Sequence, residues 1–258
     1  MKKLIGLALL LGTCNTFAQT EGNWQTRQLP GVDVQYQLID ATVADSLQVP
    51  VAEAQRTIEA FFDQPFPRKF SLFVFPHRLQ MDQQWQQAWN APGFQSECWM
   101  VASGVADRLD LLSPAVWQSE ACEHNPADRE ELQRLITHEM VHVYHGQQNP
   151  IPDFTGLDDL AWLIEGVATY VSGQLTEQRM NSVKQLVQAN KAPQKLAQFW
   201  SGKDRYGLAG SMIKWVDQTV GRQQLLALLK QTDQQKILDQ IGFTETELIE
   251  AWRRSVAD

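Results

Sequence analysis

Positive charge is scarce in this sequence. Lysine and arginine together number 22 against 30 aspartate and glutamate residues, which gives a formal net charge of −8 at pH 7. The basic residues form no run, and the chain has no internal repeat and no low-complexity linker. Nucleic acids and anionic membranes are bound by clusters of positive charge. The composition therefore argues against both as partners.

Long apolar runs are also missing. Residues 4–11 form the most apolar stretch, and it is too short to span a bilayer. Lys2 and Lys3 precede it, and residues 16–18 (Thr-Phe-Ala) place small side chains at the −3 and −1 positions of a cleavage site. Residues 1–18 therefore read as a signal peptide, which predicts a periplasmic or secreted bacterial protein. Anchoring as a lipoprotein through Cys14 is the alternative, but Thr13 fits poorly before that cysteine.

Cysteine is rare, with three residues in the chain. Loss of the signal peptide would leave two, Cys98 and Cys122, which do not form a C-x-x-C pattern. In an oxidising compartment two remaining thiols tend to pair, so we predict a disulfide. It would close a loop of about 25 residues and stabilise the fold by roughly 3 kcal/mol on the chain-entropy account. Metal binding by these cysteines is the weaker alternative.

The sequence His138-Glu139-Met140-Val141-His142 lies in a stretch with helical periodicity that starts near residue 127. Residues four apart on a helix share a face, so His138 and His142 can reach a single Zn²⁺. Glu139 would lie beside the metal, where it can accept a proton from water. The simpler alternative is that these histidines are ordinary hydrogen-bonded groups.

A second apolar stretch, residues 158–171, contains one internal carboxylate, Glu165. A lone buried carboxylate costs several kcal/mol unless it is paired or bound to a metal. Glu165 lies 23 positions after His142, which leaves room for a helix end, a loop and a returning helix. His138, His142 and Glu165 would leave one position open on a tetrahedral metal, and that arrangement is typical of catalytic zinc.

Together these motifs, His138-Glu139-x-x-His142 and Trp162-Leu163-x-Glu165-Gly166-x-Ala168, resemble the gluzincin metallopeptidases, the thermolysin-like superfamily. Within it, the small secreted peptidase MA-like domains are most similar, and the resemblance covers about residues 104–220. It implies an α+β zincin fold, with a small mixed sheet and helices in a first lobe, a mainly helical second lobe, and the active-site helix between them. Thermolysin has an aspartate four positions after its glutamate ligand, where this chain has Thr169. The hydrogen-bond partners of the ligands must therefore differ, and a backbone carbonyl or another carboxylate could serve.

The expected elements agree with one catalytic domain over residues 19–258. Its first lobe would span residues 19–147 and its helical lobe residues 148–258. Residues 19–30 are expected to have little structure. We predict strands at 32–38, 69–75, 99–102 and 108–112, and helices at 41–62 (interrupted near Pro50), 79–89, 177–190, 204–220, 223–229 and 244–255.

The two strands around Gly104 have two interpretations. In peptidase MA-like domains the corresponding stretch forms the edge strand above the metal, and such an edge can pair with an extended peptide. The alternative is an ordinary hairpin sealed against the sheet. A disulfide between Cys98 and Cys122 would tether this hairpin near the start of the active-site helix.

Tyr206 is the candidate for stabilising the oxyanion that forms when an amide is hydrolysed. Gluzincins supply such a donor from the second lobe, and Tyr206 opens a helix there. The alternative is a half-buried tyrosine that packs under its own helix. Arg205 and His145 are lesser candidates, although His145 could also serve only to cap its helix.

The sequence therefore predicts an exported metallopeptidase with one Zn²⁺ per chain and a peptide or protein substrate. It leaves the oligomeric state open, with a monomer as the default. Two other classes stay open. One is an envelope binding or assembly factor with a peptidase-like zinc site and little turnover, although the intact Glu139 argues against it. The other is a zinc hydrolase of a non-peptide bond, because the metal chemistry is shared.

Overall fold

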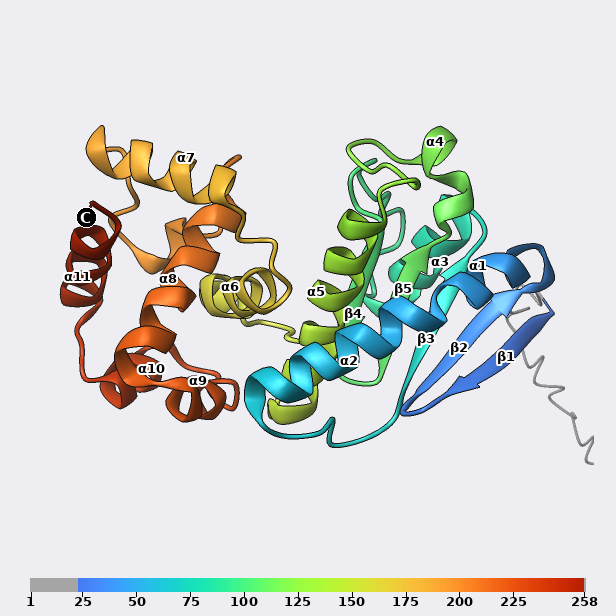
Figure 1. The fold of residues 1–258 in the computed structure, drawn as a ribbon, viewed down its shortest axis with the longest axis horizontal. Helices are drawn as coiled ribbons and strands as arrows, with labels where there is room; N and C mark the ends of the chain where they lie inside the picture. Colours follow the sequence, from blue (N-terminus) through green and yellow to red (C-terminus); the bar gives the residue numbers. More distant parts are fainter. Residues whose placement is uncertain (1–22, 258) are drawn as a thin grey trace, which may run out of the picture.

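The computed structural model describes residues 23–257. The predicted signal peptide and Cys14 lie outside the described residues. Within them the chain is mixed α and β (Figure 1). The strands are β1 (Trp24–Leu29), β2 (Val32–Gln37), β3 (Phe70–Phe75), β4 (Ala102–Val105) and β5 (Arg108–Leu112). The α-helices are α1 (Ala41–Ser46), α2 (Gln48–Phe62), α3 (Arg78–Ala88), α4 (Trp117–Glu120), α5 (Arg129–Gln148), α6 (Ala161–Val171), α7 (Glu177–Gln188), α8 (Arg205–Val220), α9 (Arg222–Leu228), α10 (Gln234–Ile241) and α11 (Glu245–Ala257).

The five strands form one mixed sheet in the order β1-β2-β3-β5-β4. The two outer pairs, β1–β2 and β4–β5, are antiparallel, whereas β2–β3 and β3–β5 are parallel. The parallel pairs need crossover connections, which α2 and α3 provide. The strand β4 is therefore an edge of the sheet, as the first interpretation of the Gly104 hairpin requires.

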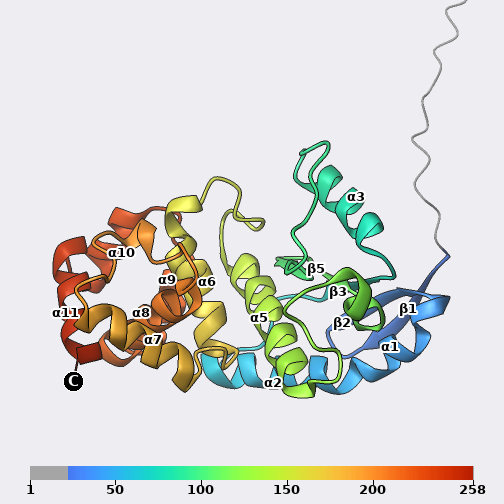
Figure 2. The same cartoon turned by 90° about the horizontal axis from the view of Figure 1, so that it is seen from above.

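Strand alternation divides the sheet into two faces. One face carries apolar residues that are fully buried against α2 and α5, among them Val34, Leu72 and Leu109. The other face is more polar and is covered by α3, whose Trp85 indole donates a hydrogen bond to Asp110. Figure 2 shows α3 on the opposite side of the sheet from α1 and α2. Helix α5 therefore lies on the apolar side of the sheet.

The helices after α5 gather on the other side of the molecule, and α5 lies between them and the sheet (Figure 1). There α6 packs closely on α5 and α8. Gly166 allows the close contact with α8, because a Cβ atom there would lie 2.7 Å from the Ala209 carbonyl oxygen. The fold thus places the two helices that carry the predicted metal ligands in direct contact.

Most of the expected elements are confirmed, and three expectations are wrong. Residues 24–29 form β1, which pairs along its whole length with β2 and packs Trp24 edge-on against Phe73 and Phe75. The strand predicted at 99–102 lies at 102–105, because residues 98–99 form a turn. Helix α10 and the short helix α4 were not predicted. The interruption near Pro50 is real, since α2 starts at Gln48 and holds the proline in its first turn, where helices tolerate it.

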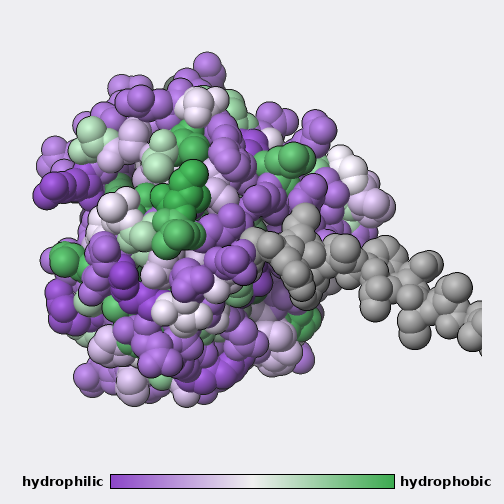
Figure 3. All heavy atoms as spheres, turned by 90° about the vertical axis from the view of Figure 1, so that its right-hand side faces the viewer, coloured by the Kyte–Doolittle hydropathy of each residue, from purple (hydrophilic) through white to green (hydrophobic). Residues whose placement is uncertain are grey.

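Within residues 23–257, no helix combines the length and apolar character needed to cross a membrane. Figure 3 shows the end of the molecule nearest α1 and β1. Polar residues cover most of this face, and its apolar residues form small groups. Such groups are normal on a protein surface.

Candidate metal centre

Helix α5 is fixed at its start by an N-cap and along its length by burial. The Asp128 side chain accepts hydrogen bonds from the backbone N–H groups of Glu130 and Glu131. The negative charges of both glutamates also stabilise the helix, because they lie at the positive end of its dipole. Every residue from Leu135 to Gly146 is buried. A helix buried on all sides holds its side chains rigidly, which suits a binding site.

His138 and His142 project from the same face of α5, as predicted. Their ring centres are 4.8 Å apart and the rings are nearly perpendicular. The two Nε2 atoms lie 3.1 Å from each other. Both side chains are buried, so the nitrogens are held at this distance inside the protein.

The carboxylate of Glu165 approaches the same point from α6. Its Oε2 lies 3.3 Å from Nε2 of His138 and 3.6 Å from Nε2 of His142. Two ligands about 2.05 Å from a tetrahedral zinc ion lie about 3.3 Å apart. The three distances in the structure therefore fit one metal ion bound by all three residues.

The charges at the site favour a cation among these three atoms. Burial alone would raise the pKa of the Glu165 carboxyl, but His142 and His138 outweigh it and hold that pKa well below its usual range. Burial would lower the pKa of His142, but Glu165 and Glu139 outweigh it and raise that pKa. Both shifts mean that the carboxylates attract positive charge to this point.

Glu139 is buried next to the ligands and is not one of them. Burial raises the pKa of its carboxyl, although the two imidazoles oppose the shift. The edge strand β4 lies directly against this turn of α5. A Cβ atom at Gly104 would come within 2.2 Å of the Glu139 carbonyl oxygen, so no other residue fits there without a shift of the backbone. Glu139 and the edge strand are thus neighbours at one end of a cleft.

The cleft has a volume of about 1260 Å³ and is lined by His138, Glu139, His142 and Glu165 together with residues from β4, α7 and α8. Tyr206 also lines it, with its ring centre 6.1 Å from that of His138. Burial and the charge of Glu165 raise the pKa of the Tyr206 hydroxyl, so this group keeps its proton. The structure thus brings Tyr206 to the metal ligands.

Arg205 reaches across the cleft. Its guanidinium lies 4.7 Å from the ring centre of Trp99, on the sheet side, and 5.2 Å from that of Trp200, on the helical side. Such cation–π contacts fix the direction of the side chain. Arg205 therefore holds the two walls of the cleft together at the point where Tyr206 enters it.

Two expectations about neighbouring residues are not met. His145 is buried against Phe154, with ring centres 5.0 Å apart, and it does not line the cleft, so it cannot reach a substrate carbonyl. The Nδ1 atoms of His138 and His142 have no hydrogen-bond partner within residues 23–257, and neither does the Thr169 hydroxyl. The expected carbonyl or carboxylate partner for the ligand imidazoles is therefore absent from this part of the chain.

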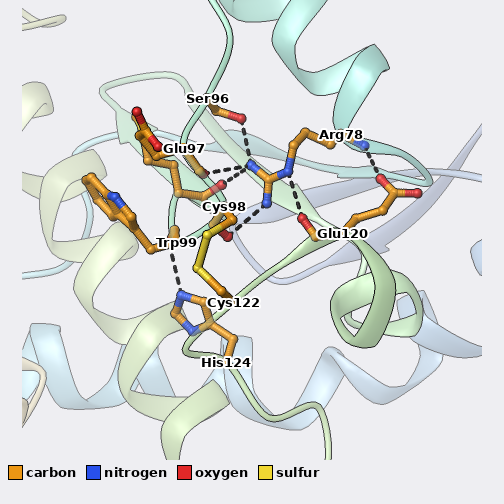
Figure 4. The surroundings of a disulfide bond; sticks show 9 residues. Arg78, Ser96, Glu97, Cys98, Trp99, Glu120, Cys122 and His124 are labelled. Carbon is orange, nitrogen blue, oxygen red and sulfur yellow. Dashed lines mark hydrogen bonds between the residues drawn. A yellow bond between two sulfur atoms is a disulfide. The ribbon is translucent and has the colours of Figure 1, made fainter.

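The predicted disulfide is present and supports the cleft wall that carries Trp99. Cys98 and Cys122 are bonded, with their Cα atoms 5.2 Å apart (Figure 4). The Arg78 guanidinium lies beside them and donates hydrogen bonds to five oxygens: Ser96 Oγ and the backbone carbonyls of Glu97, Cys98, Met100 and Glu120. An imidazole nitrogen of His124 lies 3.0 Å from the Trp99 carbonyl oxygen. Arg78, which sequence reasoning missed, thus fixes a loop that has no secondary structure of its own.

Arg179 and Arg134 also line the cleft and were not singled out from the sequence. No sequence motif contains them. They come to the same cleft only because the tertiary fold brings α7, which carries Arg179, to the cleft that α5 also lines.

Searches with family models and with curated protein sequences match nothing to this chain. The resemblance to gluzincins therefore rests on the two motifs and on the geometry of their residues.

Proposed function

We propose that this chain is an exported zinc metallopeptidase of the gluzincin type, with a thermolysin-like arrangement of its two sides. The observation that supports this most strongly is the meeting of three ligand atoms, from His138, His142 and Glu165, beside Glu139 in a cleft. The predicted signal peptide and the disulfide agree with a protein that works outside the cytoplasm.

The donor set favours zinc over other metals. Two imidazole nitrogens and one carboxylate oxygen suit Zn²⁺, whereas magnesium and calcium prefer oxygen ligands alone. Three protein ligands leave a position for water or substrate, which distinguishes a catalytic site from a structural one. A bound zinc ion would polarise the scissile carbonyl and lower the pKa of the attacking water.

Glu139 acts as the general base in this proposal. Its carboxylate takes the proton from the attacking water and then delivers it to the nitrogen of the leaving amine. A buried carboxyl with a raised pKa is suited to both steps, because it binds the proton more readily than an exposed glutamate and can release it to an amine.

The edge strand β4 provides a place for the substrate backbone. Its outer edge pairs with no strand among residues 23–257, and Ala102 to Val105 line the cleft beside Glu139. An extended peptide can hydrogen-bond to such an edge. This geometry favours a peptide over a compact non-peptide substrate.

Tyr206→Phe tests the role of the hydroxyl in this reaction. We expect kcat to fall about tenfold to a hundredfold, because one donor to the developing oxyanion is lost. Zinc content should stay unchanged, since Tyr206 is not a ligand. Steady-state kinetics on one peptide, with zinc measured on the same samples, would check this. An unchanged kcat would assign Tyr206 to packing alone.

Removal and return of the metal tests the function itself. The purified protein would be treated with a chelator, dialysed and supplied with zinc, magnesium or calcium, and its action on casein and on mixed peptides would be followed by mass spectrometry. We expect cleavage to disappear with the metal and to return with zinc but not with the other two. Zinc binding without cleavage of any peptide would favour the binding-factor alternative. New non-peptide products would favour the other hydrolase.

A further inference from the structure

Arg179 lines the cleft and lies over the ring of Tyr206. It extends from α7 into the cleft and is partly buried. Its Nη1 donates a hydrogen bond to the Gln174 carbonyl oxygen at 2.6 Å, and its other two nitrogens have no hydrogen-bond partner within residues 23–257. It forms no ion pair with any carboxylate in that part of the chain. Burial lowers the pKa of its guanidinium, as expected for a charge without a counterion.

A second arginine, Arg134 from α5, lies near enough to repel Arg179. Arg134 pairs with Glu130 one turn earlier on its own helix, whereas Arg179 has no such partner. The α7 side of the cleft around Arg179 is lined by neutral polar residues: Gln174, Thr176, Gln178 and Ser182. Both guanidinium groups line the same cleft, and an anion bound near them would offset their mutual repulsion.

We propose that Arg179, assisted by Arg134, binds a carboxylate of the peptide substrate. The Arg179 guanidinium carbon lies 4.7 Å from the ring centre of Tyr206, which is 6.1 Å from that of His138. An extended peptide advances about 3.3 Å per residue, so the carboxylate would belong to a residue within about three positions of the scissile bond. Tyr206 is thus within contact range of both Arg179 and His138.

This inference rests on the proposed peptidase function and specifies its substrate class. A carboxylate could come from the free C-terminus of a short peptide or from an aspartate or glutamate side chain. Both would make the same paired hydrogen bonds to a guanidinium. Peptides that differ only in one of these groups distinguish the two sources.

The test measures binding rather than turnover. Zinc-loaded Glu139→Gln protein would be titrated by calorimetry with six-residue peptides in four forms, with a free or amidated C-terminus and with glutamate or glutamine at internal positions. We expect the form that presents the recognised carboxylate to bind about tenfold to a hundredfold more tightly than its neutral counterpart. Arg179→Gln should remove this preference. Arg179→Lys should keep part of it, because the charge remains but the paired geometry is lost.

Arg56→Gln is the matched control, since Arg56 is exposed on α2 and lies away from the cleft. Zinc content and thermal unfolding of each variant show that the fold is intact. Equal binding of all four peptide forms, no binding of any form, or a preference that survives Arg179→Gln would overturn the inference. Cleavage of neutral peptides by the wild type in that case would leave the peptidase proposal standing. Charge-selective binding without any cleavage would support the carboxylate site and contradict the peptidase proposal.

Discussion

Replacing Glu139 with glutamine is expected to lower kcat about a thousandfold, within the range of general-base effects. The amide has nearly the shape of the carboxylate but cannot accept a proton at neutral pH. Glu139 is buried in α5 beside the metal ligands, so no other carboxylate on that helix can take its place. Steady-state kinetics on a peptide that the wild type cleaves would measure the effect.

Two controls make this result specific. Zinc content should remain at about one ion per chain in Glu139→Gln, because Glu139 is not among the three ligands. Glu250→Gln removes a charge at an exposed position of α11, away from the cleft, and should leave kcat within about twofold, as expected for a solvated surface group. A Glu139→Gln variant that keeps a tenth or more of the activity would show that Glu139 is not the general base.

The candidate metal ligands could be predicted because the relation between two of them is local. A spacing of four on a helix fixes the position of His138 relative to His142. Glu165 is the one carboxylate inside an apolar helix, so it needs a partner when the helix is buried. The packing of α6 on α5 was not visible in the sequence as a distance. The role of Gly166 also becomes visible only in the structure, where the lack of a side chain lets α8 approach α6 closely.

Other features depend on tertiary contacts that no local pattern encodes. The strand β1 has few apolar residues, and its pairing with β2 and the contacts of Trp24 hold it in the sheet. Arg78 looks like any surface arginine in the sequence, yet four of its hydrogen-bond acceptors lie in the loop at residues 96–100 and the fifth is the carbonyl of Glu120 at the end of α4. The role proposed for Arg179 likewise depends on the tertiary position of α7, which brings this side chain into the cleft.

The thermolysin comparison shows a further limit of motif reasoning. The sequence indicated that Thr169 could not orient a ligand imidazole as an aspartate would, and the structure agrees, because Thr169 is packed against Gly210. A substitute partner for the imidazoles was expected and does not occur within residues 23–257. The packing of α5 and α6 alone brings the three candidate ligands together within this part of the chain.

Loss of one of the three candidate ligands should be severe if they bind zinc as proposed. We expect His142→Ala and Glu165→Ala each to reduce bound zinc from about one ion per chain to a small fraction, because two protein ligands bind zinc far more weakly than three. Mass spectrometry of metals in the purified, dialysed proteins would measure this. Asp159→Ala, an exposed acidic position just before α6, is the matched control and should keep its zinc.

Thermal unfolding gives an independent measure of the same binding. Zinc at about a thousand times its dissociation constant stabilises a folded protein by about 4 kcal/mol. For a chain of this size that corresponds to a rise in Tm of about 10 °C. We expect the wild type and Asp159→Ala to show this rise on addition of zinc, and His142→Ala and Glu165→Ala to show little of it. An equal rise in all four proteins would place the ion elsewhere, because the residues removed would then contribute nothing to its binding.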